Sequence, residues 1–259
     1  NIVVGVPLTE EYFPDQNFRA LLAEKLGTSV GDLLTMKHLS TETLSLWRVD
    51  IGDLTGIEYF RNLRSLNVSN NPLYRLDLSK NTKLEQLDCD FSRTLEELVL
   101  PESLVSLDCE YNNLSELDLR HLINLERLNC PDNKLTALYL PQSAALKDVK
   151  CNDNLLTALD VSANMGLTSL ICYDNNLTEL LLPADSALTK LSCSSNELTA
   201  LDLTKTPHLE YLSCSYNKVP ELDLPQLSDL NELYCSQNGL TALDVSSCPN
   251  LMNLYCYGN

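Results

Sequence analysis

The chain has 259 residues, of which 44% are hydrophobic, and its 36 acidic and 18 basic residues give a formal net charge of −18. This balance argues against binding to nucleic acids or anionic membranes, which needs a basic face, and it favours a partner that carries positive charge. No run of about 18 uncharged apolar residues occurs, so we expect no transmembrane helix. The opening NIVVGVPLTEEYF has neither a basic segment nor a long apolar core, so it does not predict a signal peptide.

Residues 13–26, FPDQNFRALLAEKL, predict an amphipathic helix. Its apolar residues recur at helical spacing and share one face. Gly27 follows directly and suits the end of a helix. The residues on the predicted apolar face are Phe18, Leu21, Leu22 and Leu26. A second short helix is predicted around Leu33, Leu34 and Met36.

A 21-residue repeat dominates the rest of the chain. From Leu104 onward each copy starts L-x-x-L-x-C-x-x-N-x-L-x-x-L-x-L. The segment L-x-C has the period of a strand with one buried face. One short strand cannot bury that face alone, but stacked copies about 4.8 Å apart form a parallel sheet over a continuous core. Nine of the ten cysteines occupy the same repeat position, where we expect them to act as small buried hydrophobes.

An asparagine follows nearly every predicted strand. Its amide both donates and accepts hydrogen bonds, so a stacked column can satisfy backbone groups where each coil bends. The later L-x-L of each copy, for example Leu201 and Leu203, is predicted to return apolar side chains from the opposite wall.

These repeats resemble the bacterial leucine-rich repeats of the 21-residue type LxxLxCxxNxLxxLDLxx, also called IRREKO. The resemblance implies an α/β solenoid, a right-handed curved stack with one parallel β-sheet on its concave face. It implies a helical N-terminal cap over 1–43 and a solenoid of about ten to eleven repeats over 44–259.

The cap also resembles that of secreted or surface leucine-rich repeat proteins of gut bacteria, through the phrases FPDQNF and LTGIEYF. This resemblance implies an exported protein at the cell surface, whereas many reduced cysteines would suit the cytoplasm. Relatives often carry a calcium-loop-like segment between these phrases. Here it reads KLGTSVGDLLTMKHLSTE, without alternating oxygen ligands, so we predict no calcium there.

The turns after the second L-x-L alternate between two kinds. Every other copy has proline, as at Pro141, and the others have aspartate two residues before a serine, threonine or arginine, as at Asp160. Proline removes a donor, so we expect the two turns to differ in backbone hydrogen bonding. Residues 89–100 depart from the repeat: Ser92 replaces the asparagine and one residue is inserted, which predicts a local bulge.

No C-x-x-C pair, catalytic-serine motif, phosphate loop or HExxH motif occurs, and the three histidines are scattered. The sequence therefore predicts no cofactor, no metal and no enzymatic activity. We expect the nine cysteines at the shared repeat position to be reduced and buried. Cys248 lies on a back-face turn and is expected to be more exposed.

Two groups of side chains are predicted to project from the sheet. The first is acidic with two aromatic residues: Asp88, Asp90, Phe91, Asp108, Glu110 and Tyr111. Adjacent like charges cost stability, which suggests a basic partner or a cation; the alternative is a solvated acidic face. The second group is aromatic: Tyr173, Tyr211, Tyr216, Tyr234, Tyr255 and Tyr257. Tyrosine is enriched in binding hot spots, although it also suits any exposed strand.

The resulting hypothesis is a non-enzymatic recognition protein that binds a protein or peptide on the concave sheet. A glycan-binding surface protein and a structural spacer or assembly module are the alternatives. The chain stops at the turn asparagine of a copy, Asn259. We expect an artificial boundary there, or a dimer through this uncapped end.

Overall fold

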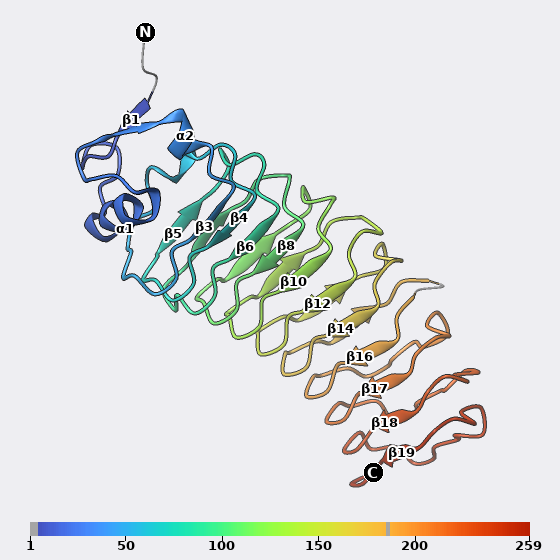
Figure 1. The fold of residues 1–259 in the computed structure, drawn as a ribbon. Coiled ribbons are helices and arrows are strands. Elements are labelled where there is room, and N and C mark those ends of the chain that lie inside the picture. The colour runs from blue at the N-terminus through green and yellow to red at the C-terminus, as the bar shows by residue number, and fades with distance from the viewer. Residues whose placement is uncertain (1–4, 185–186) are drawn as a thin grey trace. The chain divides into compact units, whose positions relative to one another are not determined.

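Two units make up the chain in the computed structural model, Asn1–Leu114 and Ser115–Asn259, and each contains a stack of similar coils (Figure 1). The structure describes residues 5–184 and 187–259. The first unit begins with a short segment of strands and helices and continues into coils, whereas the second consists of coils throughout.

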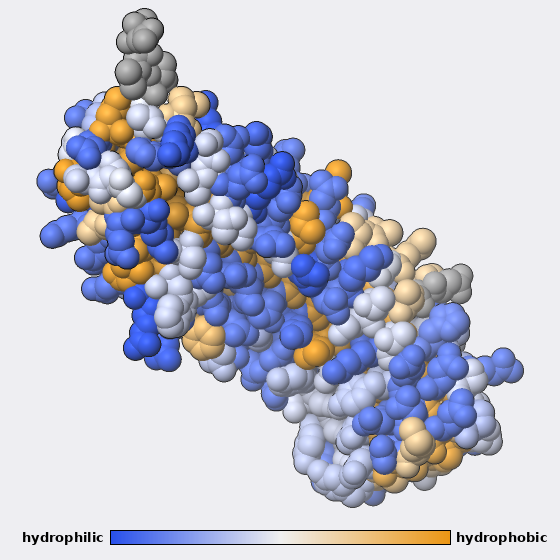
Figure 2. Space-filling model, viewed as in Figure 1, coloured by the Kyte–Doolittle hydropathy of each residue, from blue (hydrophilic) through white to orange (hydrophobic). Residues whose placement is uncertain are grey.

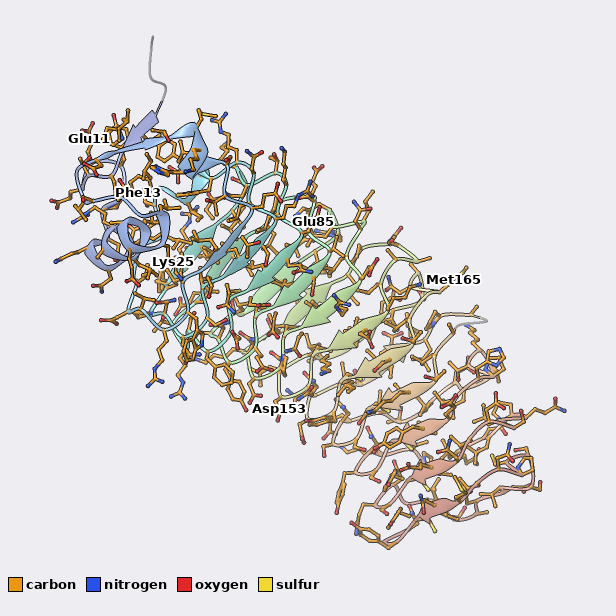
Figure 3. The ribbon with its side chains drawn as sticks, viewed as in Figure 1. Glu11, Phe13, Lys25, Glu85, Asp153 and Met165 are labelled. Carbon is orange, nitrogen blue, oxygen red and sulfur yellow. The ribbon has the colours of Figure 1, made fainter. Side chains whose placement is uncertain are left out.

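The predicted N-terminal helix is present as α1 (Gln16–Leu26). Asp15 caps it by accepting a 2.9 Å hydrogen bond from the Phe18 N–H. Gly27 ends it in the left-handed conformation, with φ of 64°. Phe18 and Leu22 are fully buried, while Leu21 and Leu26 are partly exposed at the margin of the apolar face. The second carboxylate oxygen of Asp15 accepts from the Gly52 N–H at 2.8 Å, which ties the helix to the following segment. Figure 3 labels Phe13 just before this helix and Lys25 near its end.

The prediction for the second helix is wrong for Leu33 and Leu34. They belong to strand β2 (Leu33–Thr35), which pairs antiparallel with β1 (Gly5–Pro7), and helix α2 (Met36–Leu39) starts only afterwards. The pairing places Leu34 in the core and leaves Leu33 exposed. Its partner strand lies far away in sequence, so local apolar spacing could not reveal it.

Four parallel strands form the sheet of the first unit: β3 (Thr43–Ser45), β4 (Ser65–Asn67), β6 (Gln86–Asp88) and β8 (Ser106–Asp108). Each pairs with the next in a register that stacks leucine on leucine. The 3-10 helix η1 (Ile57–Tyr59) lies between β3 and β4. On the opposite wall, β5 (Arg75–Asp77) pairs with β7 (Glu97–Val99).

Seven parallel strands form the sheet of the second unit: β10 (Arg127–Asn129), β12 (Asp148–Lys150), β14 (Ser169–Ile171), β16 (Lys190–Ser192), β17 (Tyr211–Ser213), β18 (Glu232–Tyr234) and β19 (Asn253–Tyr255). Its opposite wall contains two strand pairs, β9 (Glu116–Asp118) with β11 (Ala137–Tyr139) and β13 (Ala158–Asp160) with β15 (Glu179–Leu181). The predicted solenoid fold is confirmed. Its coils return through short strands and turns, and every helix among the described residues ends before residue 60.

The core is built from leucine columns and a column of thiols. Eight of the nine repeat-position cysteines are buried, and each of them is at most 1% exposed. Two expectations about individual cysteines are wrong. Cys248 is buried, because its turn places it at the inner position that Asn81, Asn164 and Thr206 hold in other coils. Cys256 is exposed, because among the described residues its strand end lies at the edge of the sheet, beside β18 alone.

The asparagines link consecutive coils as expected. Asn196 donates to the carbonyls of Cys172, Cys193 and Ser194 at 3.0, 3.1 and 3.2 Å, and its Oδ1 accepts from the Leu177 N–H at 2.9 Å. The same pattern recurs at Asn154, Asn175, Asn217 and Asn238. Each asparagine therefore satisfies buried backbone groups of two coils at once.

The two kinds of back-face turn differ in hydrogen bonding, as predicted. In the aspartate turns the carboxylate accepts from the backbone N–H two residues later, as in Asp77 to Ser79 at 3.0 Å and Asp160 to Ser162 at 2.8 Å. Proline replaces this arrangement in alternate coils. The strand pairs of the opposite wall, such as β13 with β15, each join one aspartate coil to one proline coil.

The irregular coil at 89–100 contains the predicted distortion. Both Phe91 and Arg93 have positive φ, 55° and 59°, whereas each of the next five coils has one such residue, from Tyr111 in the first to Ser195 in the last. With Ser92 in place of asparagine, the Oδ1 atom of Asn112 in the next coil is buried without a hydrogen-bond partner among the described residues. In a regular coil this oxygen accepts from the N–H of the leucine two residues after the preceding asparagine, as Asn196 does from Leu177. The inserted residue changes that spacing, because Leu95 comes three residues after Ser92.

Candidate binding surface

The outward face of each sheet carries two side chains per strand, because successive residues of a strand point to opposite sides. In the parallel-sheet strands from β3 to β18 the middle residue is buried and its two neighbours are more exposed. Parallel pairing without a register shift then places equivalent outward residues beside one another.

Three outward tyrosines stack along the last strands of the second unit. The ring centroids of Tyr211 and Tyr234 are 5.6 Å apart at an interplanar angle of 40°. Those of Tyr234 and Tyr255 are 4.8 Å apart and nearly parallel, at 4°. Tyr234 and Tyr255 are register partners on β18 and β19, so the sheet itself sets their stacking. The result is a rigid aromatic ridge.

A hollow of about 440 Å³ opens beside this ridge. Five of the six tyrosines predicted from the sequence line it: Tyr173, Tyr216, Tyr234, Tyr255 and Tyr257. Tyr211 packs against Tyr234 instead of lining the hollow. In Figure 2, pale surface of near-neutral hydropathy lies beside strands β16 to β19, in contrast to the blue of charged side chains.

Serines form the remaining wall of the hollow: Ser192, Ser194, Ser195, Ser213, Ser215 and Ser236. The hydroxyls of Ser194 and Ser213 are 2.7 Å apart, and Ser215 Oγ accepts from the Ser236 N–H at 3.1 Å. Ser236 is 1% exposed, and its hydroxyl has no hydrogen-bond partner among the described residues. The sequence analysis did not single out these serines. Their recurrence at two adjacent outward positions of consecutive coils was the available signal.

Two tyrosine hydroxyls meet at the corner of the hollow. Tyr216 and Tyr257 are 41 residues apart in the chain, and their hydroxyl oxygens are 2.8 Å apart. Tyr216 holds the corner position of its coil with φ of 56°, a conformation that costs a non-glycine residue energy. The hydrogen bond with Tyr216 raises the pKa of Tyr257.

Charged groups around the ridge are mostly acidic. The Tyr234 hydroxyl donates to Glu232 at 2.8 Å, and this hydrogen bond is the main cause that raises the pKa of Tyr234 to about 12. Asp174 is exposed and lines the hollow. Lys190 is a cation in contact with the ridge: its Nζ lies 5.3 Å from the centroid of Tyr211, a cation–π distance.

The predicted acidic group lies in the first unit. Asp88 and Asp108 are register partners on β6 and β8. Burial raises the pKa of Asp88, and the neighbouring charge of Asp108 adds to the rise. Asn67 offsets part of this by donating to Asp88 at 3.2 Å.

The two aromatic residues of this acidic group, Phe91 and Tyr111, stack face to face with centroids 4.5 Å apart. Their neighbour Asp90 precedes Phe91 at the same strand end, and Glu110 precedes Tyr111. In the described part of the chain, no group of three or more potential metal-binding side chains is found.

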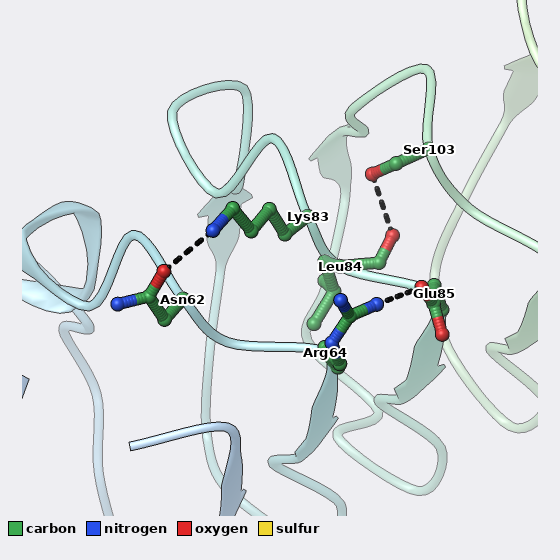
Figure 4. A network of polar contacts seen from close by, with 6 residues as sticks. All are labelled: Asn62, Arg64, Lys83, Leu84, Glu85 and Ser103. Carbon is green, nitrogen blue, oxygen red and sulfur yellow. Dashed lines mark hydrogen bonds and ion pairs between the residues drawn. The ribbon is translucent and has the colours of Figure 1, made fainter. Parts of the chain in front are cut away.

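A polar network of the first unit lies in the segments that precede β4, β6 and β8 (Figure 4). Glu85 forms an ion pair with Arg64 from the preceding coil, and Ser103 donates to the Leu84 carbonyl at 2.7 Å. Lys83 donates to Asn62 at 2.7 Å. Each contact joins adjacent coils, so these surface residues are held by the stack.

The sequence analysis missed a second hollow, of about 670 Å³, in the first unit. It lies between the segment 52–58 and the back-face segment 74–80. Its lining mixes acids and bases, including Asp53, Glu58, Arg75 and Lys80. The two segments meet only through coil stacking, so nothing in either segment alone predicts the hollow.

Stacked coils with a 21-residue leucine repeat, parallel sheet strands and an asparagine column define a class, and the chain is a leucine-rich repeat protein. Solved structures agree with this assignment. The functional domain of InlJ from Listeria monocytogenes, described as including a cysteine ladder, is 32% identical with a TM-score of 0.74, and the match covers 100% of this chain and 62% of that one. YopM from Yersinia enterocolitica is 25% identical with a TM-score of 0.58, over 92% of this chain and 59% of that one.

Among curated proteins, the putative leucine-rich repeat protein R380 of Acanthamoeba polyphaga mimivirus is 28% identical over 85 residues, which are 33% of this chain and 20% of that protein. No protein-family model matches the chain. The chain thus spans less than two thirds of the length of each of these relatives. No helix in the described residues is both long and apolar enough to cross a bilayer.

Proposed function

We propose that this is a non-enzymatic recognition protein whose sheet face in the second unit binds a protein or peptide partner. The observation that carries the proposal is the convergence of five tyrosines on one serine-lined hollow. Tyrosine combines a large apolar ring with a polar tip and loses little side-chain entropy on binding, which makes it an effective anchor. The ridge is also ordered before binding, because strand pairing and ring stacking already hold it.

The acidic group of the first unit supports a cationic partner in this proposal. Its carboxylates and the net charge of −18 would attract a basic protein and speed the encounter. Raising the salt concentration should therefore slow association more than it speeds dissociation.

The test is a double substitution, Tyr234→Ala with Tyr255→Ala, in the chain used as bait for partner capture and then for affinity measurement with the captured partner. The matched control is Tyr139→Ala, because Tyr139 is also an exposed tyrosine of the second unit but lies on β11 of the opposite wall. We expect the double variant to lose binding and the control to retain it. If the double variant binds with unchanged affinity, the proposal is rejected.

A glycan ligand is the second candidate, because hydroxyl groups beside flat aromatic rings also suit sugars. A glycan array probed with the unaltered chain and the double tyrosine variant separates the two. Hits that vanish in the variant would favour the glycan, and an array without hits would remove it.

We also propose that the protein works outside the cell or at its surface. The reduced thiols do not require the cytoplasm, because burial raises the pKa of the Cys151 and Cys193 thiols to about 12 and suppresses the reactive thiolate. Antibody labelling of intact cells, compared with lysed cells, tests this. Labelling only after lysis would overturn it.

A further inference from the structure

We infer that the serine-lined hollow of the second unit receives an arginine side chain of the partner. This inference rests on the proposed function and specifies which group enters the hollow. The lining consists of five tyrosines, six serines and one aspartate. Every polar atom that these side chains offer is either a hydroxyl or a carboxylate oxygen, and oxygen lone pairs accept the N–H groups of a cation.

The aromatic ridge already holds a cation within the chain. Lys190 places its Nζ 5.3 Å from the Tyr211 centroid, and Tyr211 packs on Tyr234, which borders the hollow. The negative face of an aromatic ring attracts a positive group, and neighbouring rings add to this field. Tyr255 is 49% exposed, so its ring is accessible to a partner's side chain.

Two carboxylates add charge complementarity, one in the lining of the hollow and one beside the tyrosine ridge. Asp174 is exposed and lines the hollow, and Glu232 touches the Tyr234 hydroxyl at 2.8 Å. The proximity of Glu232 is what raises the pKa of Tyr234, so a negative charge is held beside the ring stack. A cation in the hollow would therefore be attracted by both the rings and the carboxylates.

The shape of the ridge favours arginine over lysine. Tyr234 and Tyr255 stack face to face, parallel to within 4°, so these two rings cover each other, and the open ring surface is that of Tyr255, which is 49% exposed. A planar guanidinium stacks on an exposed aromatic ring and still donates hydrogen bonds from its edge, which a compact ammonium cannot do. Ser236 offers a buried hydroxyl without a partner among the described residues as one acceptor at the base.

Short blocked peptides test the inference. An N-acetylated, C-amidated glycine peptide with one central arginine is compared with the same peptide carrying citrulline, which has nearly the same shape but no charge. Titration calorimetry or ligand-detected NMR at low salt measures both. We expect the arginine peptide to bind about tenfold more tightly, the equivalent of about 1.4 kcal/mol.

Two variants locate the site. Asp174→Asn should narrow the preference for arginine over citrulline, and Tyr255→Leu should abolish binding of both peptides. Tyr139→Leu is the matched control and should change neither. Unchanged denaturation midpoints verify that the variants are folded.

Equal affinity for the arginine and citrulline peptides would overturn the inference, and so would arginine binding that survives Tyr255→Leu. These results leave the proposed function intact if partner capture still depends on the tyrosines. Conversely, if the double tyrosine variant captures the partner as well as the unaltered chain does, the proposed function is rejected, independently of the peptide affinities.

Discussion

Removing one rung of the asparagine column should destabilise the second unit measurably. In Asn196→Ala, the buried Leu177 N–H loses its acceptor, and the Cys172 carbonyl loses the nearer of its two donors but keeps Asn175 at 3.3 Å. An unsatisfied buried backbone group costs about 1–3 kcal/mol, so the unpaired Leu177 N–H should lower the free energy of unfolding by about that amount. That is a large share of the roughly 5–15 kcal/mol that stabilises a typical domain.

Urea unfolding followed by circular dichroism measures the change in the free energy of unfolding, with a fixed slope as the check for a cooperative transition. Hydrogen exchange at the Leu177 amide gives an independent local readout, because that amide should become the least protected of its coil. Asn217→Ala removes the same four kinds of bond and should cost a similar amount.

The control is Asn176→Ala, which changes an exposed asparagine in the coil preceding that of Asn196. It should alter the free energy of unfolding by no more than about 0.5 kcal/mol, as is usual for surface substitutions. If Asn196→Ala costs no more than this control, the column does not stabilise the stack through hydrogen bonds and our reasoning about the repeat is wrong.

Three further predictions concern titratable groups. In the native protein one thiol, Cys256, should react rapidly with a disulfide reagent near neutral pH, and Cys256→Ser should remove that phase; fast reaction of several thiols would contradict the buried column. The Asp118 carboxylate should titrate at a pKa of about 2, mainly because the Arg120 side chain donates to it. Its contribution to stability should therefore be complete above about pH 3.9 and fade as the pH falls towards 2. Arg120→Ala should raise this pKa in an NMR titration, and an unchanged pKa would show that Arg120 is not the cause. Tyr234 should ionise near pH 12, mainly because its hydroxyl donates to Glu232. Its contribution to stability should be complete below about pH 10 and lost as the pH rises through 12. Glu232→Gln should lower this pKa in an absorbance titration, and an unchanged midpoint would rule out the hydrogen bond as the cause.

Much of the candidate surface was predictable from sequence because the repeat fixes which way each residue points. A spacing of 21 residues between Tyr234 and Tyr255 is enough to place them side by side on adjacent strands. Spacing does not give ring orientation, so the near-parallel stacking of this pair was not predictable. The same limit applies to Tyr216 and Tyr257, whose hydroxyls meet across two coils.

The errors share a physical origin. Leu33 and Leu34 pair with a distant strand, and the turn geometry of a late coil turns Cys248 inward. The strand partner of Leu33 and Leu34 lies far along the chain, and the burial of Cys248 depends on the conformation of its turn. The local spacing of apolar residues contains neither kind of information.

For this protein the periodic sequence by itself determined the coil, because leucine, cysteine and asparagine at fixed intervals permit few other ways to bury apolar groups and satisfy the backbone. Tertiary structure alone decided how the outward residues combine. The serine-lined hollow, the tyrosine ridge with its carboxylates and the exposure of each thiol all arise from contacts between coils, where side-chain rotamers and packing choose among arrangements that share one repeat pattern.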